Sequence, residues 1–169
     1  MAYSLNLQDH VSFDIQATPM EILVPDGLSF QWILNGKALA FVAANATRRV
    51  VDAWMDKQAE LLKTWNPNRI TFMINSFAAP ECVMTPYARQ RLNELVKRTE
   101  HIKALSCTII ARSALGMPVV LASNAVNTIT RYRTGSQNMV FYKHDDGVRW
   151  LQRRIAEGEF VNQTSTEKP

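Results

Sequence analysis

The dipeptide Asn35-Gly36 constrains the fold of this chain more than any other sequence feature. It separates two largely apolar segments, residues 28–34 and 37–43. Asn and Gly both tolerate a positive φ, so the pair favours a tight turn whose twist matches that of the flanking strands. The sequence therefore predicts an antiparallel hairpin around Asn35-Gly36.

Two further strands are expected before this hairpin. Residues 11–16 alternate apolar and polar side chains, which is typical of a half-buried strand. Residues 21–24 form a second short apolar run, and Pro25-Asp26-Gly27 behind it is a turn signal.

After the hairpin, the spacing of apolar residues changes from every second residue to the spacing of an α-helix. Residues 47–65 carry charged side chains on one side and an apolar stripe on the other, and Thr47 is a candidate N-cap. Asn66-Pro67-Asn68 would end this helix. We expect Trp54 to lie in the core. The whole stripe is Val50, Val51, Trp54, Met55, Leu61, Leu62 and Trp65.

Strand and helix patterns then alternate to the end of the chain. Thr85-Pro86 is a helix start, with Thr as the cap and Pro at the first helical position, and Asp145 is expected to cap the last helix. The expected strands are residues 69–74, 105–111 and 137–142. The first expected helix begins at Thr85, and the second runs from Met117 or Pro118 to Tyr132. The last begins at Asp145 and ends near Gly158. The expected inward stripes are Ala88, Leu92, Leu95 and Val96 in the first of these helices and Val148, Leu151 and Ile155 in the last.

This element order predicts an α/β fold with one mixed β-sheet. The hairpin makes its first part antiparallel, and the strand–helix repeats make the rest parallel, with about four helices. A chain of 169 residues fits one domain, 1–169, with a core over about 11–158 and a flexible tail over 159–169.

Charge and cysteine content exclude several classes of protein. Residues 1–46 carry one Lys and four acidic residues, and the rest of the chain carries the remaining 18 basic and 11 acidic residues. No Lys/Arg block is dense enough to indicate nucleic-acid binding. No membrane span or secretory signal is evident, and Cys82 and Cys107 lack metal spacing, so we expect a cytoplasmic protein without cofactor or metal.

Catalytic patterns are also absent from the sequence. There is no glycine-rich phosphate loop and no Gly-x-Ser-x-Gly elbow, and the histidines are isolated. Cys82 lies in a long loop, but nothing near it in sequence would lower the pKa of its thiol.

The order of elements and three segments resemble the STAS domain group, in particular its sporulation-antagonist-like (SpoIIAA-like) branch. The segments are the strand 70–74 with the loop behind it, the helix start Thr85-Pro86-Tyr87-Ala88-Arg89, and the ending 140–151, and the likeness spans about residues 20–157. The resemblance implies a non-enzymatic regulatory domain of bacterial signalling that binds a protein partner, either a regulator or a kinase-like protein.

In that group a partner kinase phosphorylates a Ser or Thr at a helix start that follows an acidic strand end. Here Asn75-Ser76 stands at the strand end in place of the acid, and Thr85 lacks the Asp-Ser-Ser-Gly run. The resemblance implies Thr85 or Ser76 as the phosphorylated residue.

Ligands of open α/β sheets bind beyond the carboxyl ends of the parallel strands. The helices that begin there offer free backbone N–H groups, and Arg112 would add a bidentate anion donor. We therefore predict one binding site at this edge, formed by Asn75, Ser76, Thr85, Arg112 and Ser113.

Three functions remain open at this point. A docking domain should show an exposed apolar patch at a shallow edge, whereas a binder of a small anionic or amphiphilic ligand should show a pocket of a few hundred Å³ with convergent polar groups. An enzyme of unrecognised type is the third alternative. A homodimer is expected, because an open sheet exposes its edges.

Overall fold

The computed structural model describes residues 17–66, 69–98, 102–112 and 136–164. The expected strand 11–16, the expected helix 117–132 and Ser113 lie outside these ranges.

Six strands form one mixed sheet in the order of the sequence, β1-β2-β3-β4-β5-β6. Pairing is antiparallel from β1 to β3 and parallel from β3 to β6, as the sequence predicts. The strands are β1 (Glu21–Val24), β2 (Leu28–Ile33), β3 (Ala38–Ala43), β4 (Thr71–Phe77), β5 (Ala104–Ile110) and β6 (Gln137–Phe141).

The hairpin between β2 and β3 follows the turn chemistry of Asn35-Gly36. Leu34, Asn35 and Gly36 all have positive φ, at 55°, 59° and 72°, and the Lys37 N–H donates to the Leu34 carbonyl at 3.2 Å. Two consecutive positive φ angles give the turn the twist of its strands. Leu34 also has a positive φ angle, which is not that of a strand. β2 therefore ends at Ile33, one residue before its predicted end.

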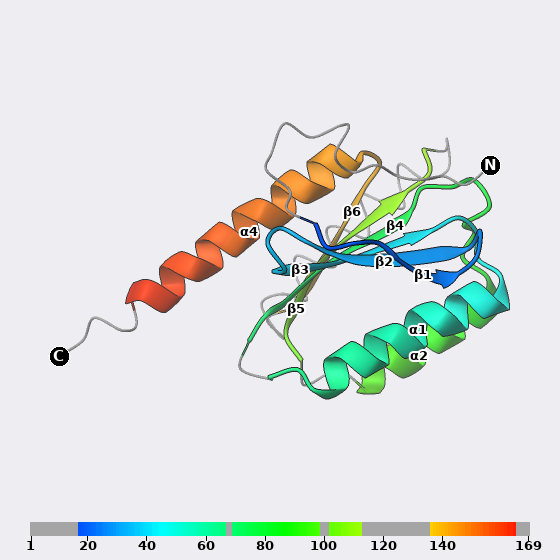
Figure 1. The fold of residues 1–169 in the computed structure, drawn as a ribbon, viewed down its shortest axis with the longest axis horizontal. Helices are drawn as coiled ribbons and strands as arrows, with labels where there is room; N and C mark the ends of the chain where they lie inside the picture. The colour runs from blue at the N-terminus through cyan, green and yellow to red at the C-terminus, as the bar shows by residue number, and fades with distance from the viewer. Residues whose placement is uncertain (1–16, 67–68, 99–101, 113–135, 165–169) are drawn as a thin grey trace.

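Helices α1 (Arg48–Lys63) and α2 (Pro86–Arg98) cover one face of the sheet, and α4 (His144–Thr164) packs on the other (Figure 1). The described part of the molecule thus has three layers. Trp54 of α1 is buried as predicted, and Leu92 of α2 is partly buried against the same cluster. Val96, predicted to face inward, is 57% exposed, because it lies on the flank of α2 that turns away from the sheet.

Each face of the sheet has its own apolar core. Under α4, Val148, Leu151 and Ile155 pack on small and medium side chains such as Ala40 and Cys107. On the opposite face, large side chains of the strands meet α1 and α2. The buried members of this second cluster include Phe30, Leu39, Phe41, Val50, Trp54, Met55, Met73 and Leu95.

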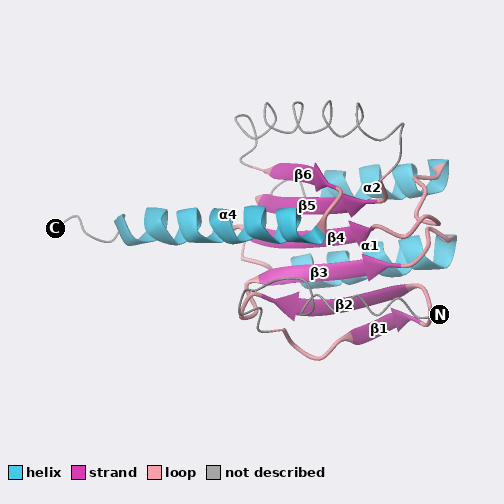
Figure 2. Ribbon diagram, turned by 90° about the horizontal axis from the view of Figure 1, so that it is seen from above, coloured by secondary structure: helices cyan, strands magenta, loops and turns pink. Residues whose placement is uncertain are grey.

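Three further predicted boundaries are wrong. The strand expected over 69–74 runs from Thr71 to Phe77, so Asn75 and Ser76 belong to β4 and not to a loop. The last helix begins at His144, with the Gly147 N–H bonded to the Lys143 carbonyl, so Asp145 lies in the first turn and is not the cap. This helix continues past Gly158 to Thr164 and extends beyond the sheet (Figure 2).

Thr47 takes the N-cap position of α1 but does not cap with its side chain. Its hydroxyl donates instead to Oδ1 of Asn45 at 2.9 Å, and the same oxygen accepts the Thr47 N–H. The Thr47 hydroxyl group, which was expected to cap the helix, therefore bonds to the side chain of Asn45.

Candidate functional site

The carboxyl ends of β3, β4, β5 and β6 meet at one edge of the sheet, and α1, α2 and α4 all begin there (Figure 2). The described strands stand in sequence order, and the crossover helices α1 and α2 share one face. The strand order does not reverse among them, so these strands provide no switch-point crevice of the kind that holds ligands in doubly wound sheets. Any site must come from the side chains and loops at this edge.

Asn75 is a buried structural partner of α1. Its side chain is only 6% exposed, and its Oδ1 accepts a hydrogen bond from Nε1 of Trp54 at 3.0 Å. This bond satisfies the indole N–H of a Trp that lies in the core. Asn75 therefore fixes α1 to the sheet.

Ser76 faces the opposite side of the sheet and meets α4. It is 2% exposed, and its Oγ lies 2.8 Å from Nε2 of His144 in the first turn of that helix. The tautomer of His144 decides which of the two groups donates. Ser76 thus joins α4 to β4 and is packed, with no open surface around its hydroxyl.

Thr85 caps α2 as the sequence predicts. Its Oγ1 accepts the backbone N–H of Ala88 at 3.1 Å, and its carbonyl accepts the N–H of Arg89 at 3.0 Å. The residue as a whole is half-buried.

Arg112 follows β5 and lines a hollow of about 350 Å³ between the end of β6 and the start of α4. Lys143 adds a second cation and Asp146 an anion, and the hydroxyl of Tyr142, also in the lining, is buried with no hydrogen-bond partner among the described residues. The other lining residues within the described ranges are Val140 and Phe141. Asn75, Ser76 and Thr85 do not border this hollow.

The predicted site is therefore divided among separate environments. Asn75 and Ser76 lie on opposite faces, Thr85 lies at the start of α2, and Arg112 borders the hollow beside α4. Ser113 lies outside the described residues.

The loop that precedes Thr85 holds residues that the sequence analysis did not select. Val83 is 65% exposed and Met84 is 56% exposed, although both are apolar. The thiol of Cys82, just before them, donates to the Ala43 carbonyl at 3.3 Å. Burial raises the pKa of this thiol to about 11, so Cys82 anchors the loop to β3 as a neutral group.

A polar cluster joins the beginnings of α1 and α2. Asp52 of α1 accepts hydrogen bonds from the hydroxyl of Tyr87 and from Nε of Arg91, both in α2. The Tyr87 hydroxyl is the main reason that the pKa of the Asp52 carboxyl lies below its usual value. The guanidinium of Arg48 lies 5.1 Å from the centroid of the Tyr87 ring. These contacts hold the two helix starts side by side.

Within the described ranges, no three His, Cys, Asp or Glu side chains gather closely enough to hold a metal ion. None of the helices in those ranges combines the length and apolar content that a bilayer span requires. Both cysteines are free thiols.

No protein-family model, no curated protein and no solved structure matches this chain.

Proposed function

We propose that this chain is a non-enzymatic interaction domain of the STAS-like type that binds a regulatory protein partner through the start of α2. The docking face consists of Val83, Met84 and Thr85. The observation that carries the proposal is the exposure of Val83 and Met84, two neighbouring apolar side chains at the carboxyl edge of the sheet. Contiguous exposed apolar patches mark interaction sites, and in this proposal Val83 and Met84 form the centre of such a patch.

The loop around these side chains is held at both ends. The Cys82 N–H bonds to the Ala79 carbonyl at 3.0 Å, and its thiol bonds to β3. On the other side Thr85 is fixed by its cap bond to Ala88. Val83 and Met84 are therefore presented on a short, anchored segment, which lowers the conformational entropy lost on binding.

Thr85 is the better placed of the two proposed phosphorylation sites. Its oxygen already accepts a helix N-terminal N–H, and a phosphate there would be stabilised by the helix dipole. It would also place two negative charges next to Val83 and Met84. Phosphorylation would thus change the docking face without breaking a core contact, whereas Ser76 is buried beneath α4.

The test is affinity capture from cells that express the protein, with Val83→Ser/Met84→Ser as the variant and Val96→Ser as the matched control. Val96 is equally exposed, at 57%, but lies near the other end of α2. The double variant should lose most of the captured partner while its thermal midpoint stays near that of the parent, and Val96→Ser should capture normally. Equal capture by all three proteins would refute the proposal.

The hollow beside Arg112 favours a second candidate function, the binding of a small anionic or amphiphilic ligand. Its size of about 350 Å³ and the cations Arg112 and Lys143 suit a carboxylate or phosphate with an apolar part, although Asp146 opposes a pure anion. Native mass spectrometry should then detect a co-purified ligand that Arg112→Ala loses. An unliganded parent protein that gains no stability from added carboxylates or phosphates would exclude this alternative.

Self-association is part of the proposal as well. β1 is the outermost of the described strands, and its Ile22 is 60% exposed. A strand at the edge of a sheet can pair with the same strand of a second copy. Sedimentation velocity at high micromolar concentration should show a dimer, and a sample that stays monomeric there would remove this part of the proposal.

A further inference from the structure

The two helices at the docking face begin without acidic residues. Neither α1 nor α2 has an Asp or Glu in its first turn. Helix starts favour negative side chains, because their free N–H groups and the helix dipole create a positive end. Here α1 begins with Arg48 and Arg49, and Arg89 follows closely on the start of α2.

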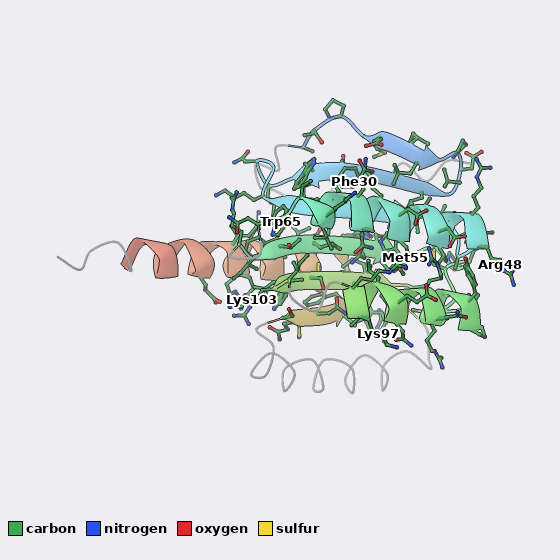
Figure 3. All side chains as sticks on the ribbon, turned by 90° about the horizontal axis from the view of Figure 1, so that it is seen from below. Phe30, Arg48, Met55, Trp65, Lys97 and Lys103 are labelled. Carbon is green, nitrogen blue, oxygen red and sulfur yellow. The ribbon has the colours of Figure 1, made fainter. Side chains whose placement is uncertain are left out.

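Both positive helix ends lie at the same corner of the molecule. In Figure 3, Arg48 marks the start of α1 next to the start of α2, and Lys97 marks the far end of α2. The contact between Arg48 and the Tyr87 ring, at 5.1 Å, confirms that the two starts are adjacent. Tyr87 is three residues from Met84, so this corner borders the docking face.

The arginines at this corner differ in how far they are neutralised. Arg91 is paired with Asp52 at 3.0 Å and with Glu94 at 2.8 Å. Arg49 and Arg89, by contrast, are exposed and make no ion pair with any residue in the described ranges. We call Arg48, Arg49 and Arg89 the arginine rim.

The acidic side chains of this corner lie in two places. Asp52, Asp56 and Glu94 surround Arg91, and Asp26 and Glu81 lie in loops. Asp52 is already bound by Tyr87 and Arg91. Glu81 is exposed in the loop before Val83, and Asp26 lies in the turn after β1, where its carbonyl meets Asn45. At the first turns themselves, three arginines and two helix N-termini lie beside the two carboxylates Asp26 and Glu81, whereas the other three carboxylates lie around Arg91.

We propose that the partner presents an acidic segment with an apolar side chain at its centre, and this inference rests on the docking function proposed above. The apolar side chain covers Val83 and Met84, while carboxylates on either side bind Arg49 and Arg89, whose guanidinium groups bond carboxylates with two parallel hydrogen bonds. A nucleic acid would use the rim but leave the apolar pair without a partner. A lipid surface needs more apolar side chains than these two for stable insertion.

Photo-crosslinking in cells that express the protein reads out the partner directly. The full-length chain carries Met84→p-benzoylphenylalanine in one strain and Val96→p-benzoylphenylalanine in a control strain, and the crosslinked peptides are sequenced. Position 84 should yield crosslinks well above position 96. The crosslinked segments should have several Asp or Glu residues within about ten positions of an apolar residue.

Charge reversal separates the rim from the apolar pair. Arg49→Glu/Arg89→Glu, combined with the crosslinker at position 84, should reduce the crosslink yield roughly tenfold, because two attractive ion pairs with the partner become repulsive. Arg153→Glu on the exposed side of α4 is the control for the change in surface charge and should have no effect.

The outcomes distinguish this inference from the docking function. Neutral or basic crosslinked segments, crosslinks to lipid, or a yield unchanged by Arg49→Glu/Arg89→Glu would overturn the acidic partner while leaving a docking surface at Met84. Equal crosslinking at positions 84 and 96 would overturn both.

Discussion

Asn75 and Ser76 are consecutive residues of β4, and their side chains bind helices on opposite faces of the sheet. Asn75 accepts a hydrogen bond from Trp54 in α1, and Ser76 bonds to His144 in α4. Because side chains alternate along a strand, neighbours in sequence cannot share a site on one face. The pair therefore connects the three layers of the protein at the end of its central strand.

Asn75→Ala is expected to cost about 1–3 kcal/mol of the free energy of unfolding, because it leaves the buried indole N–H of Trp54 without an acceptor. Trp54→Phe removes that donor, so the double variant should be less destabilised than the sum of the two single variants. Urea unfolding of all four proteins gives the coupling energy. Additive effects would mean that the bond contributes nothing.

The sequence could not place Asn75 and Ser76, for a physical reason. Their partners lie 21 and 68 residues away, and nothing local indicates that two polar residues after an apolar run continue the strand. The β2–β3 hairpin was predictable because Asn35-Gly36 acts through its own φ angles. Local chemistry thus gave the strands, the turns and the cap at Thr85, whereas the burial of polar residues depended on distant helices.

Gly147→Ala should destabilise the fold by about 1–3 kcal/mol. A Cβ at this position would lie 2.7 Å from Cδ1 of Ile109 and 3.1 Å from Sγ of Cys107, so either these packed side chains or α4 would have to shift. Helix propensity alone predicts the opposite sign, a gain of up to about 1 kcal/mol. The thermal midpoint of Gly147→Ala decides between the two: a lower midpoint than that of the parent supports the steric conflict, and a higher one supports the effect of helix propensity.

Ile109→Val tests the same contact from the other side, because it removes the Cδ1 atom. In that background Gly147→Ala should cost less than in the parent. A stabilised Gly147→Ala variant would show that α4 lies farther from the sheet than described here.

Cys82 should react slowly with iodoacetamide. Burial raises the pKa of its thiol from 9.0 to about 11, so at pH 8 the thiolate is about a hundredfold scarcer than in an exposed cysteine. The rate should rise steadily with pH up to about 11. The variant Cys107→Ala restricts the signal to Cys82, and the same protein unfolded in guanidinium provides the reference rate. Alkylation of the folded protein at the reference rate would show that the bond to Ala43 is open.

Tyr87→Phe should raise the pKa of the Asp52 carboxyl toward its ordinary value, since the Tyr87 hydroxyl is the first cause of the lowering. A lowered folded pKa stabilises the protein above the unfolded value near about 3.9, and this contribution is lost as the pH falls through the folded pKa. Tyr87→Phe should therefore make the free energy of unfolding depend less on pH below about pH 4. The effect should be small, because the Asp52 side chain is 40% exposed and solvent screens its charge.

Carboxyl chemical shifts followed by NMR from pH 2 to 7 measure this change. Glu94 provides the internal control, because Arg91 is the main cause of its lowered pKa and Tyr87→Phe leaves that pair intact. An Asp52 titration that does not move would show that the Tyr87 bond is absent in solution.

Of the predicted site residues in the described ranges, only Thr85 has a structural role that the sequence could predict, that of a helix cap. Its position between a loop and a helix start is a local pattern, and the cap bond to Ala88 bears it out. Val83 and Met84 were missed because apolar residues in a loop are expected to turn inward. In the structure both are exposed, beside a cysteine whose thiol bonds to the Ala43 carbonyl. The adjacency of the α1 and α2 starts likewise follows from sheet topology and from the Asp52–Tyr87 contact, which no sequence pattern reveals.

Hydrogen–deuterium exchange of the free protein and of its complex with the captured partner tests most directly where the working surface lies. Residues 78–92 and 44–52, which contain the docking face and the arginine rim, should gain protection in the complex. Residues 137–146, which border the hollow beside Arg112, should exchange as in the free protein. Protection confined to 137–146, with 78–92 unchanged, would contradict the docking face and move the working surface to that hollow.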